Sequence, residues 1–292
     1  MDAISVVNLQ KYFGKKAAVD GVSFTVPRGQ VFGFLGPNGA GKTTTIRCMM
    51  DFIRPTAGTI AIMGKDAQKE SVMVKRHVGY LSGSVRLHSQ WTGQDHIDFY
   101  RSTNHGVHDV AGALCERFSL DPRIQFHKLS SGNKQKIGIV LAFMFQPDVL
   151  ILDEPTNALD PLLQNEVYGL LHEATKRGST VFMSSHNLAE VDRTCDRVGI
   201  IRDGKMVAIE SIQSLKSKRM HIVHATFAKP VDTKTLTFDG GQIVQAQANH
   251  VVVNVKGDLN GVVRALGKYD LRDLSIDHAP LEDIFLEFYN AK

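Results

Sequence analysis

A run of nine residues, GPNGAGKTT (36–44), holds three glycines, one lysine and two threonines between an apolar stretch and a helical pattern. It matches G-x-x-x-x-G-K-[ST] from Gly36 to Thr43. Glycines let successive backbone N–H groups point at phosphate oxygens, and the following helix adds its positive end. Lys42 can reach the β- and γ-phosphates, and the Thr43 hydroxyl can ligate Mg²⁺. The strand before it and the helix after it favour a nucleoside triphosphate site over a glycine-rich turn that merely caps a helix.

Two adjacent carboxylates, Asp153 and Glu154, end the apolar run VLILDEP (149–155). Neighbouring acids at the end of a buried strand repel each other and lose hydration, which costs free energy. A bound cation or a role in proton transfer would account for that cost. We expect Asp153 to hold Mg²⁺ through water and Glu154 to act as the general base on the attacking water. The alternative is that the pair caps the next element at the surface. Kinases, GTPases and motor ATPases all use a phosphate loop, so further residues must decide the class.

A second stretch of small polar residues opens a helical pattern in LSSGNKQKIGIVLAF (129–143). Ser130, Ser131 and Gly132 leave backbone amides free near any anion, as at the phosphate loop. Taken alone, the stretch is an ordinary helix N-cap. Its place about twenty residues before Asp153 makes a second anion site the better interpretation.

The composition is that of an ordinary globular protein. The 292 residues are 43% hydrophobic and 22% charged, enough for one large domain or for one large and one small domain. The formal charge of +4 suits phosphates or an anionic membrane surface and is too weak to argue for nucleic-acid binding. Three widely spaced cysteines without a CxxC pair indicate reduced thiols in a cytoplasmic protein rather than a disulfide framework or a zinc site.

No targeting or membrane-spanning segment is expected. The start, MDAISVVNLQKYFG, lacks a charged region followed by an apolar stretch, so we predict no signal peptide. The most apolar run, IGIVLAFMF (137–145), is about half the length of a bilayer-spanning helix.

Strands and helices alternate through the first two thirds of the chain, which predicts an α/β domain around a largely parallel sheet. Asp160, Pro161 and Gly178 are the expected N-cap, first position and end of one helix. Asp203-Gly204 is the expected turn of a hairpin. Strand-like runs occupy 4–10, 22–36, 58–64, 148–153, 179–186 and 198–210, and a helix is expected at 41–53.

The character of the sequence shifts near residue 212. QSLKSKRM (213–220) is basic and polar, and short strand-like runs with glycine-rich spacers follow it. We predict a first domain over 1–212, with a helical part at about 84–145, and a small α+β domain over 218–292.

The types of these motifs and their order along the chain resemble those of the nucleotide-binding subunit of an ABC transporter. LSSGN resembles the family's LSGGQ signature and precedes VLILDEPTNALDP at the family's spacing. FMSSHNLAEVDRTCDRVGII resembles the switch-histidine segment, and KYFGKKAAVDGVSF resembles the segment whose aromatic residue stacks on adenine. The match covers roughly residues 4–212. It implies the fold of an ABC cassette, with a mainly parallel core sheet, an antiparallel β subdomain and a helical subdomain.

The resemblance also implies roles for individual residues. Tyr12 would stack on adenine, although the adjacent Phe13 could take its place. Ser131 and Gly132 would contact the γ-phosphate of ATP held by a partner cassette, and Asp160 would lie in the loop that links the two sites. His186 would contact the γ-phosphate or the attacking water, with Asp153 and Glu154 in the roles given above. Phosphate and magnesium contacts would come from Gly36, Asn38, Gly39, Gly41, Lys42, Thr43 and Thr44.

Two segments depart from the family pattern. Most members of the family place a glutamine after the strand that HVGYLSG matches, and no glutamine is present there. YLSGS instead resembles a branch of the family in which Tyr-Leu-Pro-Gly is followed by an acidic residue. Ser84 occupies the position of that acidic residue. Serine is a weaker metal ligand than a carboxylate, and Gln90 is a distant substitute that we do not expect to serve. In the signature, Ser131 replaces glycine and adds a Cβ and a hydroxyl near the γ-phosphate. Since Glu154 and His186 are intact, we still expect hydrolysis of ATP with Mg²⁺.

The resemblance implies partners. Two cassettes, identical or different, would meet head to tail with ATP between one phosphate loop and the other signature. Hydrolysis would let them open and would drive integral membrane permease subunits at the cytoplasmic face of the cell membrane. The surface at 84–105, with Trp91 and Phe99, is the candidate docking site; the alternative is an amphipathic helix buried in its own domain. LEDIFLEFY (281–289) resembles the tail of ABC-2 type exporters of drugs, antibiotics or polysaccharides and favours export.

Three other classes remain in competition. A soluble ABC ATPase that acts in translation would usually carry two cassettes in one chain, and this chain has one. A soluble ABC ATPase of DNA repair would carry a long coiled coil between the phosphate loop and the signature. Here only about ninety residues without heptads lie between those two motifs. A P-loop kinase for a small molecule would leave LSSGN, Asp160 and His186 without a use. A regulatory cassette with weak turnover would account for Ser84 and Ser131.

Overall fold

The computed structural model describes residues 2–103, 108–217, 220–232 and 236–278. The chain divides into two units, Met1–Ser211 and Ile212–Lys292. The predicted tail segment 281–289 lies outside the described residues.

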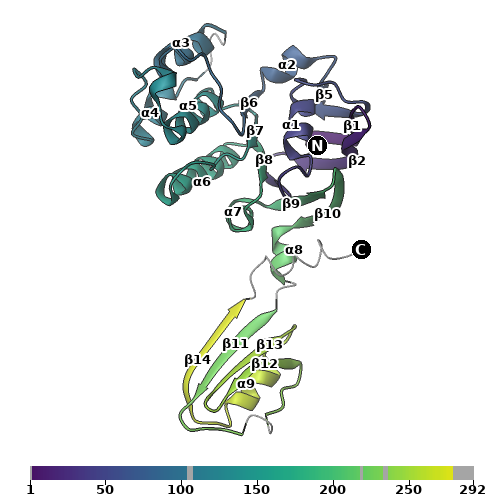
Figure 1. The fold of residues 1–292 in the computed structure, drawn as a ribbon, viewed down its shortest axis with the longest axis vertical. Coiled ribbons are helices and arrows are strands. Elements are labelled where there is room, and N and C mark those ends of the chain that lie inside the picture. Colours follow the sequence, from purple (N-terminus) through teal and green to yellow (C-terminus); the bar gives the residue numbers. More distant parts are fainter. Residues whose placement is uncertain (1, 104–107, 218–219, 233–235, 279–292) are drawn as a thin grey trace. The chain divides into compact units, whose positions relative to one another are not determined.

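A six-stranded sheet forms the centre of the first unit, in the order β10-β9-β3-β8-β7-β6 (Figure 1). All neighbouring pairs are parallel except β9 and β10, which form the predicted hairpin around Asp203-Gly204. Asp203 and Gly204 both have positive φ, at 50° and 77°, as a two-residue hairpin turn requires. The strands are β3 (Val31–Leu35), β6 (Val78–Leu81), β7 (Val149–Asp153), β8 (Thr180–Ser185), β9 (Arg197–Arg202) and β10 (Lys205–Ser211).

A second, antiparallel sheet belongs to the same unit, in the order β2-β1-β4-β5. Its strands are β1 (Asp2–Phe13), β2 (Lys16–Pro27), β4 (Ala57–Ile62) and β5 (Lys65–Asp66). Phe24 of β2 stacks on Phe32 of β3 and on Phe182 of β8, with ring centroids 5.5 and 5.4 Å apart. This apolar core joins the two sheets, so the phosphate loop after β3 is supported from both.

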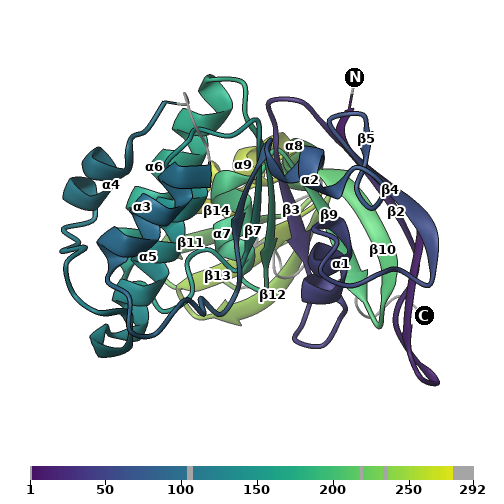
Figure 2. The same ribbon diagram turned by 90° about the horizontal axis from the view of Figure 1, so that it is seen from above.

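Three helices of the first unit lie close together. Figures 1 and 2 show α3, α4 and α5 together on the side of the parallel sheet away from the antiparallel sheet. The alternating parallel strands and helices, together with the antiparallel sheet, confirm the predicted α/β fold class. The bounds are α1 (Lys42–Met49), α2 (Ser71–Lys75), α3 (Gly93–Thr103), α4 (Ala111–Arg117), a 3₁₀ turn at Phe126–Lys128, α5 (Ser131–Phe143), α6 (Pro161–Lys176) and α7 (Leu188–Thr194).

The second unit contains a four-stranded antiparallel sheet in the order β12-β13-β11-β14. Val223, Val251, Val253 and Val262 are fully buried in its own core, which α9 shares with the strands. This is the small α+β architecture expected after the basic stretch. The bounds are α8 (Ile212–Ser217), β11 (His221–Phe227), β12 (Gly241–Gln247), β13 (His250–Val255), α9 (Asn260–Leu266) and β14 (Leu271–His278).

All three cysteines are buried and free, as expected from their spacing. Burial raises the pKa of Cys48 to about 11 and that of Cys195 to about 12, and it raises the pKa of Cys115 as well. In the ranges that the structure describes, no helix has the length and apolar character needed to cross a bilayer.

Candidate functional site: a phosphate loop and its carboxylates

The strand register brings the predicted chemical residues to one edge of the parallel sheet. β8 lies between β3 and β7, with Leu35 opposite Ser185 and Asp153 opposite Ser184. The carboxyl ends of these parallel strands therefore meet, and the loop before α1, the acid pair and His186 all follow them. Residues far apart in the sequence converge because each follows a strand of the same sheet.

The phosphate loop encloses the side chain of Lys42, which is only 5% exposed. Its ammonium donates to the carbonyl oxygens of Gly36 and Pro37, at 2.7 and 3.2 Å. Burial lowers the pKa of Lys42, and the nearby carboxylates of Glu154 and Asp153 oppose that shift. Gly41 precedes the helix at φ 107°, and a Cβ there would lie 2.5 Å from the carbonyl oxygen of Ala18. The loop thus requires glycine at this position.

Thr43 and Asp153, the two residues predicted to hold Mg²⁺, are hydrogen-bonded to each other. The Thr43 hydroxyl donates to Oδ2 of Asp153 at 2.8 Å, and the Ser184 hydroxyl donates to Oδ1 at 2.5 Å. Asp153 is 2% exposed, and both of its carboxylate oxygens accept hydrogen bonds from hydroxyl groups. Hydroxyl and carboxylate oxygens are the ligands that Mg²⁺ prefers, and the donor set therefore fits this ion.

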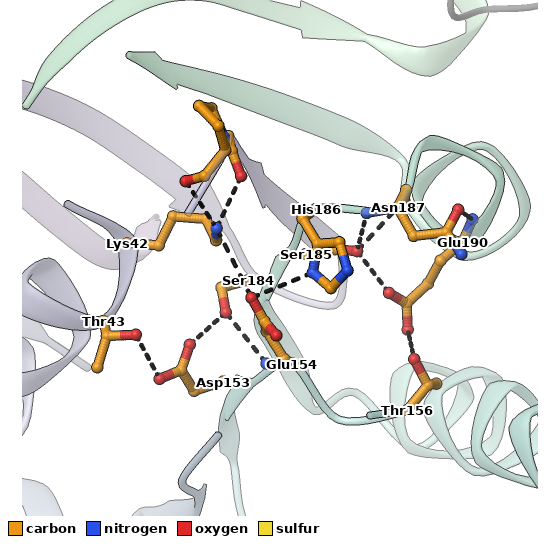
Figure 3. A network of polar contacts seen from close by, with 12 residues as sticks. Lys42, Thr43, Asp153, Glu154, Thr156, Ser184, Ser185, His186, Asn187 and Glu190 are labelled. Atoms are coloured by element: carbon orange, nitrogen blue, oxygen red, sulfur yellow. Dashed lines mark hydrogen bonds and ion pairs between the residues drawn. The ribbon is translucent and has the colours of Figure 1, made fainter. Parts of the chain in front are cut away.

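Glu154 lies between the phosphate loop and His186 (Figure 3). Its Oε1 is 3.7 Å from Nζ of Lys42 and 3.2 Å from Nδ1 of His186. The backbone of Glu154 has φ 50°, an uncommon value for a residue with a side chain. Its N–H donates to the hydroxyl oxygen of Ser184 at 3.1 Å and to the Ser184 carbonyl at 3.2 Å, which holds this strained conformation.

A cavity of about 510 Å³ opens over the phosphate loop and is the natural space for a nucleotide. Phe13, 53% exposed, lines it, whereas Tyr12 does not. The Tyr12 hydroxyl instead donates to Asp20 at 3.2 Å, and the charge of Asp20 raises the pKa of Tyr12. The structure therefore favours Phe13 over Tyr12 as the aromatic residue for adenine. The remaining lining residues are Lys16, Ala17, Ala18, Asn38, Gly39, Gly41, Lys42, Thr43, Thr44, Glu154, Asp203 and Gly204.

The signature residues begin a helix elsewhere in the first unit. The Ser130 side chain accepts the N–H of Asn133 and caps α5, where Ser131 and Gly132 are the first helical residues. Neither Ser131 nor Gly132 lines the cavity over the phosphate loop of the same chain.

Asp160 serves as the predicted cap of α6. Its carboxylate accepts the N–H groups of Leu162 and Leu163, both at 3.0 Å. Gln135 of α5 donates to the carbonyl of Pro155 at 3.0 Å and so ties the signature helix to the chain segment after the acid pair.

Ser84 lies near Thr43 and Asp153. It lines a cavity of about 380 Å³ together with Thr43, Asp153, Arg47 and Arg86. Gln90 does not line this cavity, and its carbonyl oxygen accepts a hydrogen bond from Gln125 at 3.4 Å.

Sequence reasoning missed several polar residues that shape the site: Ser184, Ser185, Thr156 and Glu190. Figure 3 shows Ser184 hydrogen-bonded to Asp153 and Glu154, and Ser185 and Thr156 hydrogen-bonded to Glu190. The signal was available, because β8 is buried throughout and two consecutive serines at its end would lose their water unless they had protein partners.

The fold and the site together define a phosphate-loop nucleotide-binding protein with an acid pair at the same edge of the sheet. The family model described as ABC transporter matches residues 19–157. Daunorubicin resistance ATP-binding protein DrrA3 of Streptomyces coeruleorubidus is 30% identical over 97% of this chain and 95% of its own length. The chain belongs to the ATP-binding subunits of ABC transporters, a family of ATPases.

Two further similarities agree with this family. Probable multidrug ABC transporter ATP-binding protein YbhF of Escherichia coli (strain K12) is 34% identical over 74% of this chain, which spans only 38% of that longer relative. A solved structure of the ATP-binding subunit of an ABC transporter superposes with a TM-score of 0.69 at 27% identity, over 73% of this chain and 92% of that one.

Proposed function

We propose that this chain binds and hydrolyses ATP to drive export through separate membrane-embedded subunits. The observation that carries the proposal is the position of the Glu154 carboxylate, between Lys42 and Nδ1 of His186 at the rim of the cavity. A base for the attacking water belongs beside the γ-phosphate, and Lys42 marks where that phosphate binds.

Each residue has a distinct task in this scheme. Lys42 and the loop amides bind the β- and γ-phosphates, and Phe13 stacks on the base. Thr43 and Asp153 would hold Mg²⁺, which supplies charge neutralisation for the phosphates when bound. Glu154 takes a proton from water, and His186 orients that carboxylate from the opposite side.

A second cassette completes the site. Since Ser131 and Gly132 do not line the cavity of their own chain, they are available to the nucleotide of a partner. Free amides at the start of α5 then contact the γ-phosphate, and ATP holds the two cassettes together. The partner is a second copy of this chain or a different cassette.

The membrane subunits need a docking surface, and two features support one near α3. Trp91 packs against His88, His96 and Phe99 of its own domain, with ring centroids 5.0 to 5.6 Å away, yet Phe99 remains 52% exposed. The neighbouring Tyr100 lines a groove of about 260 Å³ together with aromatic residues such as Phe52 and Phe145 and the basic residue Lys75. Membrane subunits held there would place this chain at the cytoplasmic face of the membrane.

The direction of transport is inferred from relatives. The names of DrrA3 and YbhF refer to daunorubicin resistance and to multidrug transport, which supports a drug-class exporter. A regulatory cassette with weak turnover is the second candidate, supported by Ser84 beside Thr43 and Asp153.

Purification of the tagged chain from detergent-extracted membranes tests the proposal. We expect an integral membrane protein to co-purify and to stimulate phosphate release from ATP. Co-purification without any ATP turnover would favour the regulatory cassette, and a chain that hydrolyses ATP with no membrane partner would favour a soluble ATPase.

A further inference from the structure

Glu190 is a buried carboxylate that the scheme above leaves without a role. It lies in the first turn of α7 and is only 3% exposed. Within the residues that the structure describes, it forms no ion pair with a lysine or an arginine. A buried acid costs free energy through lost hydration unless hydrogen bonds replace the water.

Two hydroxyl groups replace that water, and they come from different parts of the chain. The Ser185 hydroxyl donates to Oε2 of Glu190 at 2.5 Å, and the Thr156 hydroxyl donates to Oε1 at 2.8 Å (Figure 3). Ser185 also accepts the N–H of Asn187 at 2.9 Å, which fixes the turn that carries His186. Burial raises the pKa of Glu190, whereas these two hydrogen bonds oppose the shift.

The two hydroxyl groups flank the proposed catalytic residues. Thr156 follows Glu154 by two positions, and Ser185 directly precedes His186. A cavity of about 150 Å³ is lined by residues of both segments, including Glu154, His186 and Glu190. Beyond the strand ladder that pairs Asp153 with Ser184, the hydrogen bonds of Glu190 join the Thr156 segment to the Ser185 turn beside this cavity.

We propose that Glu190 is a positioning residue that clamps the Thr156 segment to the Ser185 turn and thereby holds Glu154 within reach of His186. The inference rests on the roles proposed for Glu154 and His186. Glu190 does not touch the nucleotide cavity, so its loss should affect turnover and leave ATP binding in place. Misplacement of a catalytic group by about 1 Å can lower a rate by about 100-fold.

Steady-state ATP hydrolysis by purified full-length variants tests the clamp. We expect Glu190→Ala to lower kcat by about tenfold or more while KM for ATP stays within about twofold. Glu190→Gln should recover most of the loss, because its amide oxygen and NH₂ group can still bridge two hydroxyl groups that are free to rotate. Glu116→Ala, an exposed glutamate of α4, is the matched control and should match the wild type.

Thr156→Val is the second variant, in case Glu190→Ala does not fold. It removes one donor at nearly constant volume and should lower kcat in the same way, and combining it with Glu190→Ala should lower kcat no further. An unchanged kcat in Glu190→Ala, or equal losses in Glu190→Ala and Glu190→Gln, would overturn the clamp. Glu154→Gln separates the two proposals: if that variant keeps its turnover, the assigned base is wrong, whatever Glu190 does.

Discussion

The Thr43 hydroxyl donates to Oδ2 of Asp153 across 2.8 Å, although the two residues are 110 positions apart. One follows β3 and the other ends β7, so the bond joins the phosphate loop to the acid pair. The same two residues are proposed to hold Mg²⁺, Thr43 directly and Asp153 through water, and the predictions below begin with them.

Thr43→Val should remove the magnesium dependence of nucleotide binding. The variant keeps the shape of the side chain and loses the hydroxyl ligand, so Mg²⁺ should no longer tighten ATP binding relative to EDTA. Turnover should fall by about 100-fold or more, because the metal neutralises phosphate charge. Fluorescence titration with a labelled ATP analogue, with and without Mg²⁺, measures this. Asp121→Asn, an exposed loop carboxylate that pairs with Arg123, is the control and should keep the response. A Thr43→Val protein that still responds to Mg²⁺ would remove Thr43 from the metal site.

Glu154→Gln should abolish turnover and preserve ATP binding. The amide keeps the size of the side chain and cannot take a proton, so phosphate release should fall by about 100-fold or more. Single-turnover phosphate release together with ATP affinity separates the two effects. Undiminished release would refute Glu154 as the base.

Glu154→Gln also supplies a test of the proposed dimer. With ATP present, the slow variant should elute from a sizing column as a dimer of cassettes. Adding Ser131→Arg should return it to the monomer, because the large side chain blocks the signature helix, while ATP binding to the phosphate loop persists. The Glu154→Gln, Asp121→Asn double variant serves as the control and should remain dimeric. Dimers that tolerate Ser131→Arg would place the signature outside the interface.

Phe13→Ala should weaken ATP binding by about 1 to 2 kcal/mol, through the loss of stacking on the base. Tyr12→Ala is the matched control, because it removes a neighbouring aromatic ring that does not line the cavity. Equilibrium titration of both variants with ATP decides between the two aromatic residues. Stronger weakening in Tyr12→Ala than in Phe13→Ala would restore the expectation drawn from the sequence.

Asp160→Ala should lower the free energy of unfolding by about 1 kcal/mol, because the first N–H groups of α6 lose their cap. Asp160→Asn retains an oxygen acceptor and should stay within about 0.5 kcal/mol of the wild type. Urea denaturation followed by circular dichroism measures both. If the two variants lose equal stability, the charge of Asp160 matters more than its hydrogen bonds.

The phosphate loop, the acid pair and the helix cap at Asp160 could all be predicted from the sequence. Each depends on local chemistry: glycine before a helix, acids after an apolar strand, or a capping residue before proline. The parallel order of strands then brings distant motifs together without any further information.

The choice between Tyr12 and Phe13 could not be read from the sequence. Alternation along a strand normally tells which side chain faces which side, but the pairing of β1 with β2 shifts register between Lys11 and Tyr12. The clamp at Glu190 was also hidden, because it depends on a side-chain contact between Thr156 and a helix that begins more than thirty residues later.

The buried thiols make the native chain suitable for site-specific labelling. With Cys48, Cys115 and Cys195 all shielded from water and held in the protonated form, maleimide dyes have little to react with at neutral pH. A cysteine engineered on the exposed surface would then carry the fluorophore, and energy transfer between copies could follow their approach and separation during each cycle.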